Sequence, residues 1–497
     1  MIAIWKRLVL PCLLTASCMA ATAADPTRIL LRLEAGMDER AFLQDLGRRF
    51  EPGFSLQRRL GRTLVVRLAP ALPRAEAETL VGRIGELAGV VYAQLPPGRM
   101  QPQFVPNDAL YPDQWHLFEA YGIDAQNAWD RTRGGSRVVI AQVDTGILAH
   151  EDLDAARILP GYDFVSNEIS ANDGDGSDPD PTDPGDAVAE NECPGGNPAR
   201  PKSSWHGLLV AGVMLATADN ARGIAGVDHR ARLLPVRAFG KCGGDFLDIL
   251  AGMSWAAGLP VTGVPANPNP ADVINLSFSG SDPCDPAIQD IIDQIRARGV
   301  VLVAAAGNAG SAGMSEALPA NCDGVIAVTA TNRAGDRAAY SNHGAGIDLA
   351  APGGDGLGLL PTTDNDGDVT PGNDDYRSVS GTSFSAAQVS AAVALMRALD
   401  PAVTPDTVTS LLINSARPFP AGSTCTTAIC GAGILDLDAV LLQTSSSGGV
   451  VVDDGGGGGG CVLATDRRPD IGLALLLLAV LGVRFACRSA CLNCRSG

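Results

Sequence analysis

The sequence predicts an α/β protein: an open parallel sheet covered by helices, preceded by a small α+β domain. Near-continuous runs of Val, Ile and Leu recur between residues 138 and 328, and such strands are buried on both faces, as in a parallel sheet. Segments with helical spacing lie between these runs. The chain has 497 residues, 46% of them hydrophobic and 19% charged. It is therefore globular and long enough for more than one domain.

The first unit after the N-terminal leader is expected over residues 24–103. Strands are predicted at 29–33, 64–68 and 90–93, and amphipathic helices at 38–50 and 76–87. Mixed strands and helices in so small a unit indicate an α+β domain. Residues 25–103 hold twelve Arg, no Lys and nine carboxylates, so their charge complements the acidic remainder and favours docking on it.

The parallel-sheet domain is expected over residues 104–443. Its strands are predicted at 138–143, 231–236, 273–276, 300–305 and 324–328, and its helices at 208–216, 246–257 and 287–298. In open sheets of this class, functional sites lie at the carboxyl ends of the strands.

Both ends of the chain carry signals for export. Residues 1–23 have the basic start, apolar run and small-x-small ending (Ala21-Thr22-Ala23) of a signal peptide. A cut before Asp25 fits nearly as well, and Leu14 to Cys18 also resembles a lipoprotein cleavage box. With either alternative, the chain is expected to leave the cytoplasm.

A Ser/Gly linker is predicted at 444–460, followed by a C-terminal segment at 461–497. The segment contains an apolar run of thirteen residues, 471–483, with Arg484 and Arg488 after it. That run is shorter than the roughly 17–25 residues that span a bilayer. We expect the segment to contact the membrane, either as an anchor or as a sorting signal that is removed.

The net charge is −18 and the isoelectric point is near 4.7, which excludes nucleic acid as a partner because no basic stripe is available for phosphates. Of the twelve cysteines, two lie in the leader and four in the last forty residues. An even number in an exported chain indicates disulfides, and the remaining six allow 15 pairings. We favour Cys193–Cys242, Cys284–Cys322 and Cys425–Cys430.

Three segments carry residues suited to amide hydrolysis. Asp144 ends a buried strand, His206 begins an apolar helix, and Ser383 lies where another helix begins. A serine hydroxyl needs a base such as imidazole to remove its proton, and a carboxylate orients that imidazole. Taken singly, each residue also has an ordinary structural interpretation, and only the combination is informative.

A fourth segment supplies a hydrogen-bond donor for the oxyanion of the reaction. Asn308 follows the buried strand 300–305 through small residues. The N-terminus of the helix at Ser383 adds a positive dipole that favours negative charge there.

Together these segments resemble the subtilisin-like serine proteases, in which the triad also follows the order Asp, His, Ser. The resemblance covers about residues 115–442 and implies a three-layer catalytic domain. It implies that Asp144 orients His206, that His206 is the general base, that Ser383 is the nucleophile, and that Asn308 and the Ser383 N–H form the oxyanion hole. It further implies an exported serine endopeptidase acting on protein and peptide substrates. Residues 24–103 would then be a propeptide that inhibits the enzyme and is removed by self-cleavage.

Two positions depart from the family pattern: Leu208 replaces a Thr after the His-Gly pair, and Ala387 replaces a Pro after the nucleophile. Neither position carries chemistry in the family.

Two alternatives to an active endopeptidase remain. One is a binding module that kept the fold and lost catalysis, and the other is a different hydrolase, such as an esterase, that uses the same triad.

The resemblance also places the substrate. Ser277, Phe278 and Ser279 occupy the segment that pairs with substrate backbone, and Ser279 stands where Gly is common. Ala317 falls at the base of the specificity pocket. Its neutral side chain predicts apolar or aromatic residues before the scissile bond.

An acidic loop between Asp144 and His206 predicts a structural calcium ion, because clustered carboxylates repel one another unless a hard cation lies among them. A solvated acidic loop is the alternative. Asp152 also matches a calcium ligand of the family. The candidate ligands are Asp152, Asp173, Asp175, Asp178, Asp180, Asp183 and Asp186.

Overall fold

A computed structural model describes residues 28–70, 72–96, 103–193, 195–315, 317–356 and 358–447. The predicted signal peptide, most of the linker and the C-terminal segment with its apolar run lie outside these residues. The chain divides into two compact units, with the boundary in the N-terminal part at residue 102.

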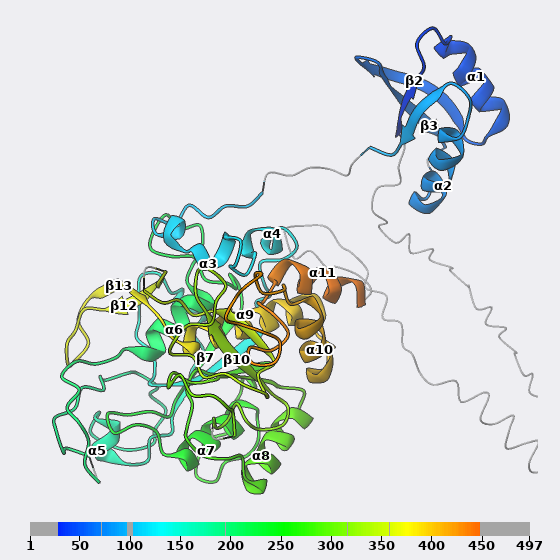
Figure 1. Ribbon diagram of the computed structural model, residues 1–497. Coiled ribbons are helices and arrows are strands. Elements are labelled where there is room, and N and C mark those ends of the chain that lie inside the picture. Colours follow the sequence, from blue (N-terminus) through cyan, green and yellow to red (C-terminus); the bar gives the residue numbers. More distant parts are fainter. Residues whose placement is uncertain are drawn as a thin grey trace, which may run out of the picture. The chain divides into compact units, whose positions relative to one another are not determined.

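The N-terminal unit is an antiparallel sheet with two helices (Figure 1). The strand order is β2-β3-β1-β4, with β1 Arg28–Leu33, β2 Gly53–Leu60, β3 Thr63–Ala69 and β4 Val90–Gln94, and the helices are α1 Glu39–Arg49 and α2 Arg74–Gly85. Asp38 caps α1 by accepting from the N–H groups of Arg40 and Ala41. Ile29 and Leu31 of β1 pack with Leu46 of α1 in one small core, so the predicted α+β unit is present. The sequence did not predict β2.

The second unit is built on a seven-stranded parallel sheet of order β11-β10-β9-β8-β5-β7-β6. The strands are β5 Val139–Asp144, β6 Tyr162–Asp163, β7 Arg232–Arg237, β8 Val273–Leu276, β9 Val301–Ala305, β10 Val325–Thr331 and β11 Leu349–Pro352. A two-stranded hairpin, β12 Leu360–Asn365 and β13 Asp374–Val379, stands apart from this sheet. All five predicted strands are therefore present.

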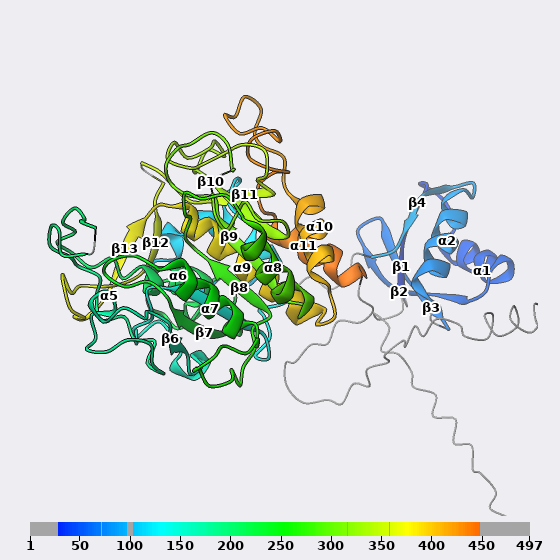
Figure 2. The same ribbon diagram turned by 90° about the horizontal axis from the view of Figure 1, so that it is seen from below.

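Helices cover both faces of the sheet, giving the expected three layers (Figures 1 and 2). One core contains α6 His206–Leu215, α9 Thr382–Leu399 and α11 Leu437–Ser447, and the other contains α7 Phe246–Ala256 and α8 Pro286–Ala297. Figure 2 places α7 and α8 in front of the sheet. The remaining helices are α3 Trp115–Phe118, α4 Ala125–Trp129, α5 Glu168–Ala171 and α10 Pro405–Ser415.

The last helix of this unit is longer than the sequence predicted. Helix α11 continues to Ser447, beyond the predicted start of the linker at 444. The reason is local packing, because Thr444 is buried and its hydroxyl donates to the Val440 carbonyl at 2.8 Å.

Within the described ranges, no helix is long and apolar enough to cross a membrane.

Candidate active site

Asp144 is the last residue of β5, at the carboxyl end of a strand whose six residues are all buried. Its Oδ1 accepts a hydrogen bond from the N–H of Thr145 at 2.8 Å and another from Nδ1 of His206 at 2.7 Å. An ionised carboxylate only accepts, so Nδ1 must carry the proton. Nε2 of His206 is then left free to act as a base.

His206 begins α6 because a glycine lets this helix approach the end of β5. A Cβ on Gly207 would lie 1.9 Å from the carbonyl oxygen of Gly146, so a side chain has no room there. The N–H of Gly207 donates to the Thr145 hydroxyl at 3.0 Å. The imidazole is 29% exposed, which leaves it open to the cavity described below.

Burial lowers the pKa of His206, while the negative charges of Asp144, Asp186 and Asp183 raise it. The carboxylates prevail, and the pKa lies above the usual 6.5. The imidazole therefore keeps its proton to a higher pH than a free histidine.

This shift predicts the pH dependence of any reaction that uses His206 as a base. We expect kcat/KM to rise with pH along a limb centred above that of a free histidine, because only the neutral imidazole accepts a proton. Replacing Asp186 with Asn removes one of the raising charges, so the limb should move to lower pH. The measurement is kcat/KM on a neutral peptide from about pH 5 to about pH 9, with Asp290→Asn on the exposed side of α8 as the control. A limb that stays in place in Asp186→Asn would contradict the assigned cause.

Ser383 is the second residue of α9, and Thr382 to Arg397 of this helix are all buried. The Ser383 hydroxyl donates to the carbonyl of Ser277 at 2.9 Å, and the Ser277 hydroxyl donates back to the carbonyl of Ser383 at 2.8 Å. This reciprocal pair joins the segment after β8 to the start of α9. Within the described structure, the Ser383 hydroxyl bonds Ser277 and not His206.

Asn308 follows β9, and Thr382 fixes the orientation of its amide. Asn308 Oδ1 accepts from the Thr382 N–H at 3.0 Å and from the Thr382 hydroxyl at 2.9 Å. The Nδ2 group lies on the opposite side of the amide and is available as a donor.

A cavity of about 350 Å³ brings the predicted residues together. The residues that line it include Asp144, His206, Ser383, Asn308, Ser277 and Phe278. Asp186, which the sequence analysis assigned to calcium, lines the same cavity.

The loop that carries Asn308 is held by Asn342, which the sequence analysis did not single out. Asn342 is buried, its Nδ2 donates to the Ala306 carbonyl at 2.9 Å, and its Oδ1 accepts from the N–H groups of Ala309 and Ser311 at 3.1 and 3.0 Å. No spacing rule identifies such a residue, because its partners lie more than thirty residues earlier in the sequence.

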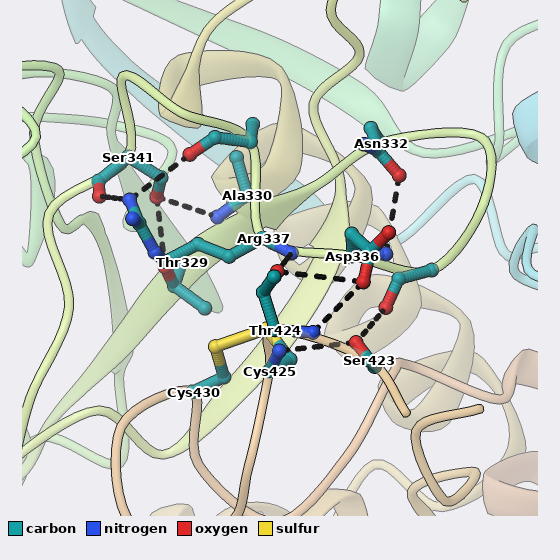
Figure 3. Close-up of a disulfide and its surroundings, with 12 residues drawn as sticks. Thr329, Ala330, Asn332, Asp336, Arg337, Ser341, Ser423, Thr424, Cys425 and Cys430 are labelled. Carbon is teal, nitrogen blue, oxygen red and sulfur yellow. Dashed lines mark hydrogen bonds between the residues drawn. A yellow bond between two sulfur atoms is a disulfide. The ribbon is translucent and has the colours of Figure 1, made fainter. Parts of the chain in front are cut away.

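A disulfide braces the neighbouring segment (Figure 3). Cys425 and Cys430 are bonded, and the adjacent Thr424 donates its N–H to Asp336 at 2.8 Å and accepts from the Arg337 N–H at 3.1 Å. Arg337 then donates through its guanidinium to the carbonyl of Ser341 at 2.8 Å, next to Asn342. The structure also forms Cys193–Cys242 and Cys284–Cys322, so the three pairs are those favoured from the sequence.

The structure places the predicted substrate residues Phe278, Ser279 and Ala317 differently. Phe278 packs against Phe239, a residue that the sequence analysis missed, with ring centroids 4.9 Å apart and the rings tilted by 52°. Ser279 faces the segment after β9, since a Cβ on Gly307 would lie 2.9 Å from Ser279 Oγ. Ala317 is buried in the core of α7 and α8. Ser279 and Ala317 are not among the residues that line the 350 Å³ cavity.

The carboxylates of the acidic loop do not converge on one point. Asp173 pairs with Arg237, Asp183 accepts from the Thr145 hydroxyl at 2.7 Å, and Asp186 accepts from the N–H and hydroxyl of Ser204 at 2.6 and 2.8 Å. The other three carboxylates, those of Asp175, Asp178 and Asp180, are in the same loop, and Asp178 and Asp180 accept from backbone N–H groups of that loop. Among the described residues, no group of three or more His, Cys, Asp or Glu side chains could hold a metal ion. As folded here, the loop does not fit calcium.

Asp152 lies elsewhere, beside a second buried carboxylate. It is fully buried near Asp108, which is 3% exposed. Asn220 joins them, because its side-chain amide donates to Asp152 at 2.7 Å and its N–H to Asp108 at 3.4 Å. Burial raises the pKa of both carboxyls, and the negative charge of Asp108 raises that of Asp152 further, as the charge of Asp219 does for Asp108. The two buried carboxylates are ligands of the kind that a hard cation prefers, whereas the Asn220 amide turns its nitrogen to Asp152 and its oxygen accepts from the Arg222 N–H.

Comparison with known proteins agrees with this site. The sequence profile described as the subtilase family, Peptidase_S8, matches residues 135–445. An extracellular protease of Xanthomonas campestris is 44% identical over 379 residues, which cover 76% of this chain and 63% of that protein. Subtilisin Savinase of Lederbergia lenta is 30% identical over 318 residues, which cover 64% of this chain and 95% of that protein.

A solved structure supports the same relationship. The structure, described as proteases from Pseudoalteromonas arctica, has a TM-score of 0.66 and 46% identity, and the match covers 69% of this chain and 100% of that one. The chain spans 63% and 53% of the lengths of two of its curated relatives. The family profile covers more than half of the chain, and the domain has the expected parallel sheet between two layers of helices. This chain therefore belongs to the subtilase family.

Proposed function

We propose that this chain is an exported serine endopeptidase that hydrolyses peptide bonds in proteins. The observation that carries the proposal is the 2.7 Å hydrogen bond from His206 Nδ1 to Asp144, at the edge of one cavity that also contains Ser383 and Asn308. The names of the relatives, an extracellular protease and a subtilisin, support the same activity.

The reaction would begin with a rotation of the Ser383 side chain. Its hydroxyl gives up the hydrogen bond to the Ser277 carbonyl and donates to His206 Nε2 instead. This requires a change between staggered positions about χ1. The Ser383 oxygen then attacks the scissile carbonyl carbon while its proton passes to Nε2. Asp144 stabilises the positive imidazolium that results.

The tetrahedral intermediate places a negative oxygen near Asn308. Nδ2 of Asn308 and the N–H of Ser383 donate to it, and the N-terminus of α9 adds its dipole. The C–N bond breaks as His206 returns the proton to the leaving amine. Water, deprotonated by His206, then releases the acyl group from Ser383.

We further propose export through residues 1–23 and self-cleavage of the N-terminal unit. The relative named as an extracellular protease supports export. The position and compact α+β fold of residues 28–96 suit an intramolecular inhibitor, and the surplus of arginine favours its association with an acidic enzyme.

The test uses the full chain, secreted as wild type and as Ser383→Ala. We expect the wild type to lose mass up to about residue 103 and to digest casein, and the variant to stay full length and inactive. Casein is required, because ester hydrolysis alone does not separate a peptidase from an esterase. Folded, uncleaved and inactive chains in both samples would favour the binding module, with the Leu208 and Ala387 positions as the first to examine.

We also propose a structural calcium ion at Asp152, Asp108 and Asn220, in place of the acidic loop. Removing calcium with EDTA should lower the melting temperature, because the two buried carboxylates then repel each other. At calcium 100-fold above its Kd, the loss corresponds to about 2.7 kcal/mol. Asp152→Asn should lose this EDTA response, whereas Asp178→Asn in the acidic loop should keep it. A melting temperature that does not respond to EDTA in the wild type would refute the ion.

The position of Ser279 predicts the residue preferred before the scissile bond. His206 takes the leaving-group side, so the acyl side must enter between the segments after β8 and β9, where Ser279 lies against Gly307. We therefore expect small apolar residues to be preferred over aromatic ones before the scissile bond. The sequence analysis allowed both apolar and aromatic residues at that position. Ser279→Gly should raise kcat/KM for a Phe substrate about tenfold or more relative to an Ala substrate, measured on a peptide panel. Ser281→Gly, exposed two residues later, is the control, and an unchanged Phe-to-Ala ratio in Ser279→Gly would contradict the assignment.

A further inference from the structure

Strand β5 has a polar side chain within its buried interior. Gln142 is 3% exposed, and its Nε2 donates to the carbonyl of Gly207 at 2.7 Å. Its Oε1 is buried and has no hydrogen-bond partner within the described structure. A buried amide with an open acceptor is less stable there than an apolar side chain of similar size. Packing alone therefore gives no reason for a glutamine at this position.

Gln142 completes a clamp on the residue that follows His206. The Gly207 carbonyl accepts from Gln142, and the Gly207 N–H donates to the Thr145 hydroxyl at 3.0 Å. Gln142 and Thr145 flank Asp144 on the same strand end. The segment that carries the carboxylate thus also holds the backbone beside the imidazole.

The neighbouring strand β8 likewise holds the backbone at the proposed nucleophile. Asn275 of β8 is fully buried, and its Nδ2 donates to the Ser277 hydroxyl at 2.8 Å, while its Oδ1 accepts from Ser390 of α9 at 2.8 Å. The Ser277 hydroxyl in turn donates to the carbonyl of Ser383 at 2.8 Å. Asn275 is therefore linked to α9 at two points, Ser390 directly and Ser383 through Ser277, which lie seven residues apart on that helix.

The two amides are neighbours in the sheet. Gln142 and Asn275 are paired in the parallel register of β5 and β8, and paired residues of parallel strands project from the same face. On this face Gln142 contacts α6 and Asn275 contacts α9. The two helices that begin at the catalytic residues are thus held by adjacent side chains of two adjacent strands.

We infer that Gln142 and Asn275 are positioning residues that set the spacing between His206 and Ser383. The inference rests on the proposed function. Neither side chain lines the cavity, so each acts through another group. The sheet register fixes where the two amides stand, and the amides fix the first turns of α6 and α9.

The first experiment uses Gln142→Met in the full chain, a change that keeps the length of the side chain and removes its amide. We expect kcat on a peptide substrate to fall at least about tenfold, with KM within about twofold, while the melting temperature is not lowered because the open Oε1 acceptor is gone. Gln114→Met is the matched control, since the Gln114 amide is equally buried and bonds the backbone of Ala225. That variant should lose stability and keep kcat.

A second measurement does not depend on turnover. In the Ser383→Ala background, imidazole NMR follows the titration of His206, whose raised pKa depends on the nearby Asp144. Gln142→Met should move this titration to lower pH, whereas Gln114→Met should not. If wild type fails to digest casein, the proposed function fails and the titration still decides the positioning role. An unmoved titration, or a kcat that falls only in step with stability, would overturn the inference.

The shared spacing is tested by combining the two positions. Gln142→Met with Asn275→Ala should lose less activity than the product of the single losses, because both side chains control one distance. Losses that simply multiply would show that the two residues act independently, which would overturn the paired role.

Discussion

Replacing His206 with alanine is expected to lower kcat by at least about 10⁴-fold while leaving the protein folded. In the proposed mechanism the imidazole removes the proton of Ser383 and later supplies a proton to the leaving amine, so both halves of the reaction would lose their acid–base group. The measurement is kcat on a chromogenic peptide, with circular dichroism to confirm folding. In the full chain the same change should block removal of the N-terminal unit.

If the three residues act as a unit, as proposed, this prediction has an internal control. The double variant His206→Ala with Ser383→Ala should be about as slow as either single variant. His229→Gln serves as the histidine control, because His229 stacks on Trp129 with ring centroids 4.6 Å apart and does not line the cavity. Substantial turnover by His206→Ala would mean that another base operates and that the assigned mechanism is wrong.

Replacing Asn308 with leucine should cost about 10²–10³ in kcat, the size known for removing one such donor from a subtilisin. Leucine has nearly the shape of asparagine and cannot donate a hydrogen bond to the oxyanion. KM should change little, because the donor is used mainly in the transition state. Steady-state kinetics separates the two parameters.

The Asn308 variant also loses the two bonds from Thr382, so its stability must be measured alongside. Thr382→Val removes the hydroxyl bond to Asn308 and keeps the N–H bond, and it should cost less in kcat than Asn308→Leu. Equal kcat values for wild type and Asn308→Leu would exclude Asn308 from the oxyanion site.

The sequence predicted the elements whose signal is local. β5, β8 and β9 are mostly apolar runs, so they were recognisable as buried strands, and Asp144 and Asn308 follow from where two of them end. His206 and Ser383 were placed at helix starts from the pattern of the residues that follow them. Each of these inferences needs only a few neighbouring residues.

Elements that lack an apolar pattern, or that are satisfied by distant partners, could not be predicted. β2 is an exposed edge strand without apolar alternation, and β12 is buried although it is polar. The β12 threonines are satisfied by α6, since Thr362 and Thr363 donate to the carbonyls of Leu209 and Leu208 at 2.6 and 2.8 Å. Such a pairing, about 150 residues apart in sequence, leaves no periodic signal.

The acidic loop shows the same limit for charge. The clustering of its carboxylates favoured calcium, but Asp173 is paired with Arg237, a guanidinium 64 residues later that also pairs with Asp163. An internal cation thus neutralises part of a cluster for which the sequence suggested a metal. The sequence cannot reveal which positive group reaches a carboxylate.

The burial of α9 determines how the enzyme should lose activity on heating. Ser383 begins a helix whose residues from Thr382 to Arg397 are all buried, passing between the sheet and the other helices of its core. Amide protons in such an element exchange with solvent only when the whole domain opens. Ser383, the proposed nucleophile, is therefore coupled to the most cooperative part of the fold, and inactivation should coincide with global unfolding rather than precede it.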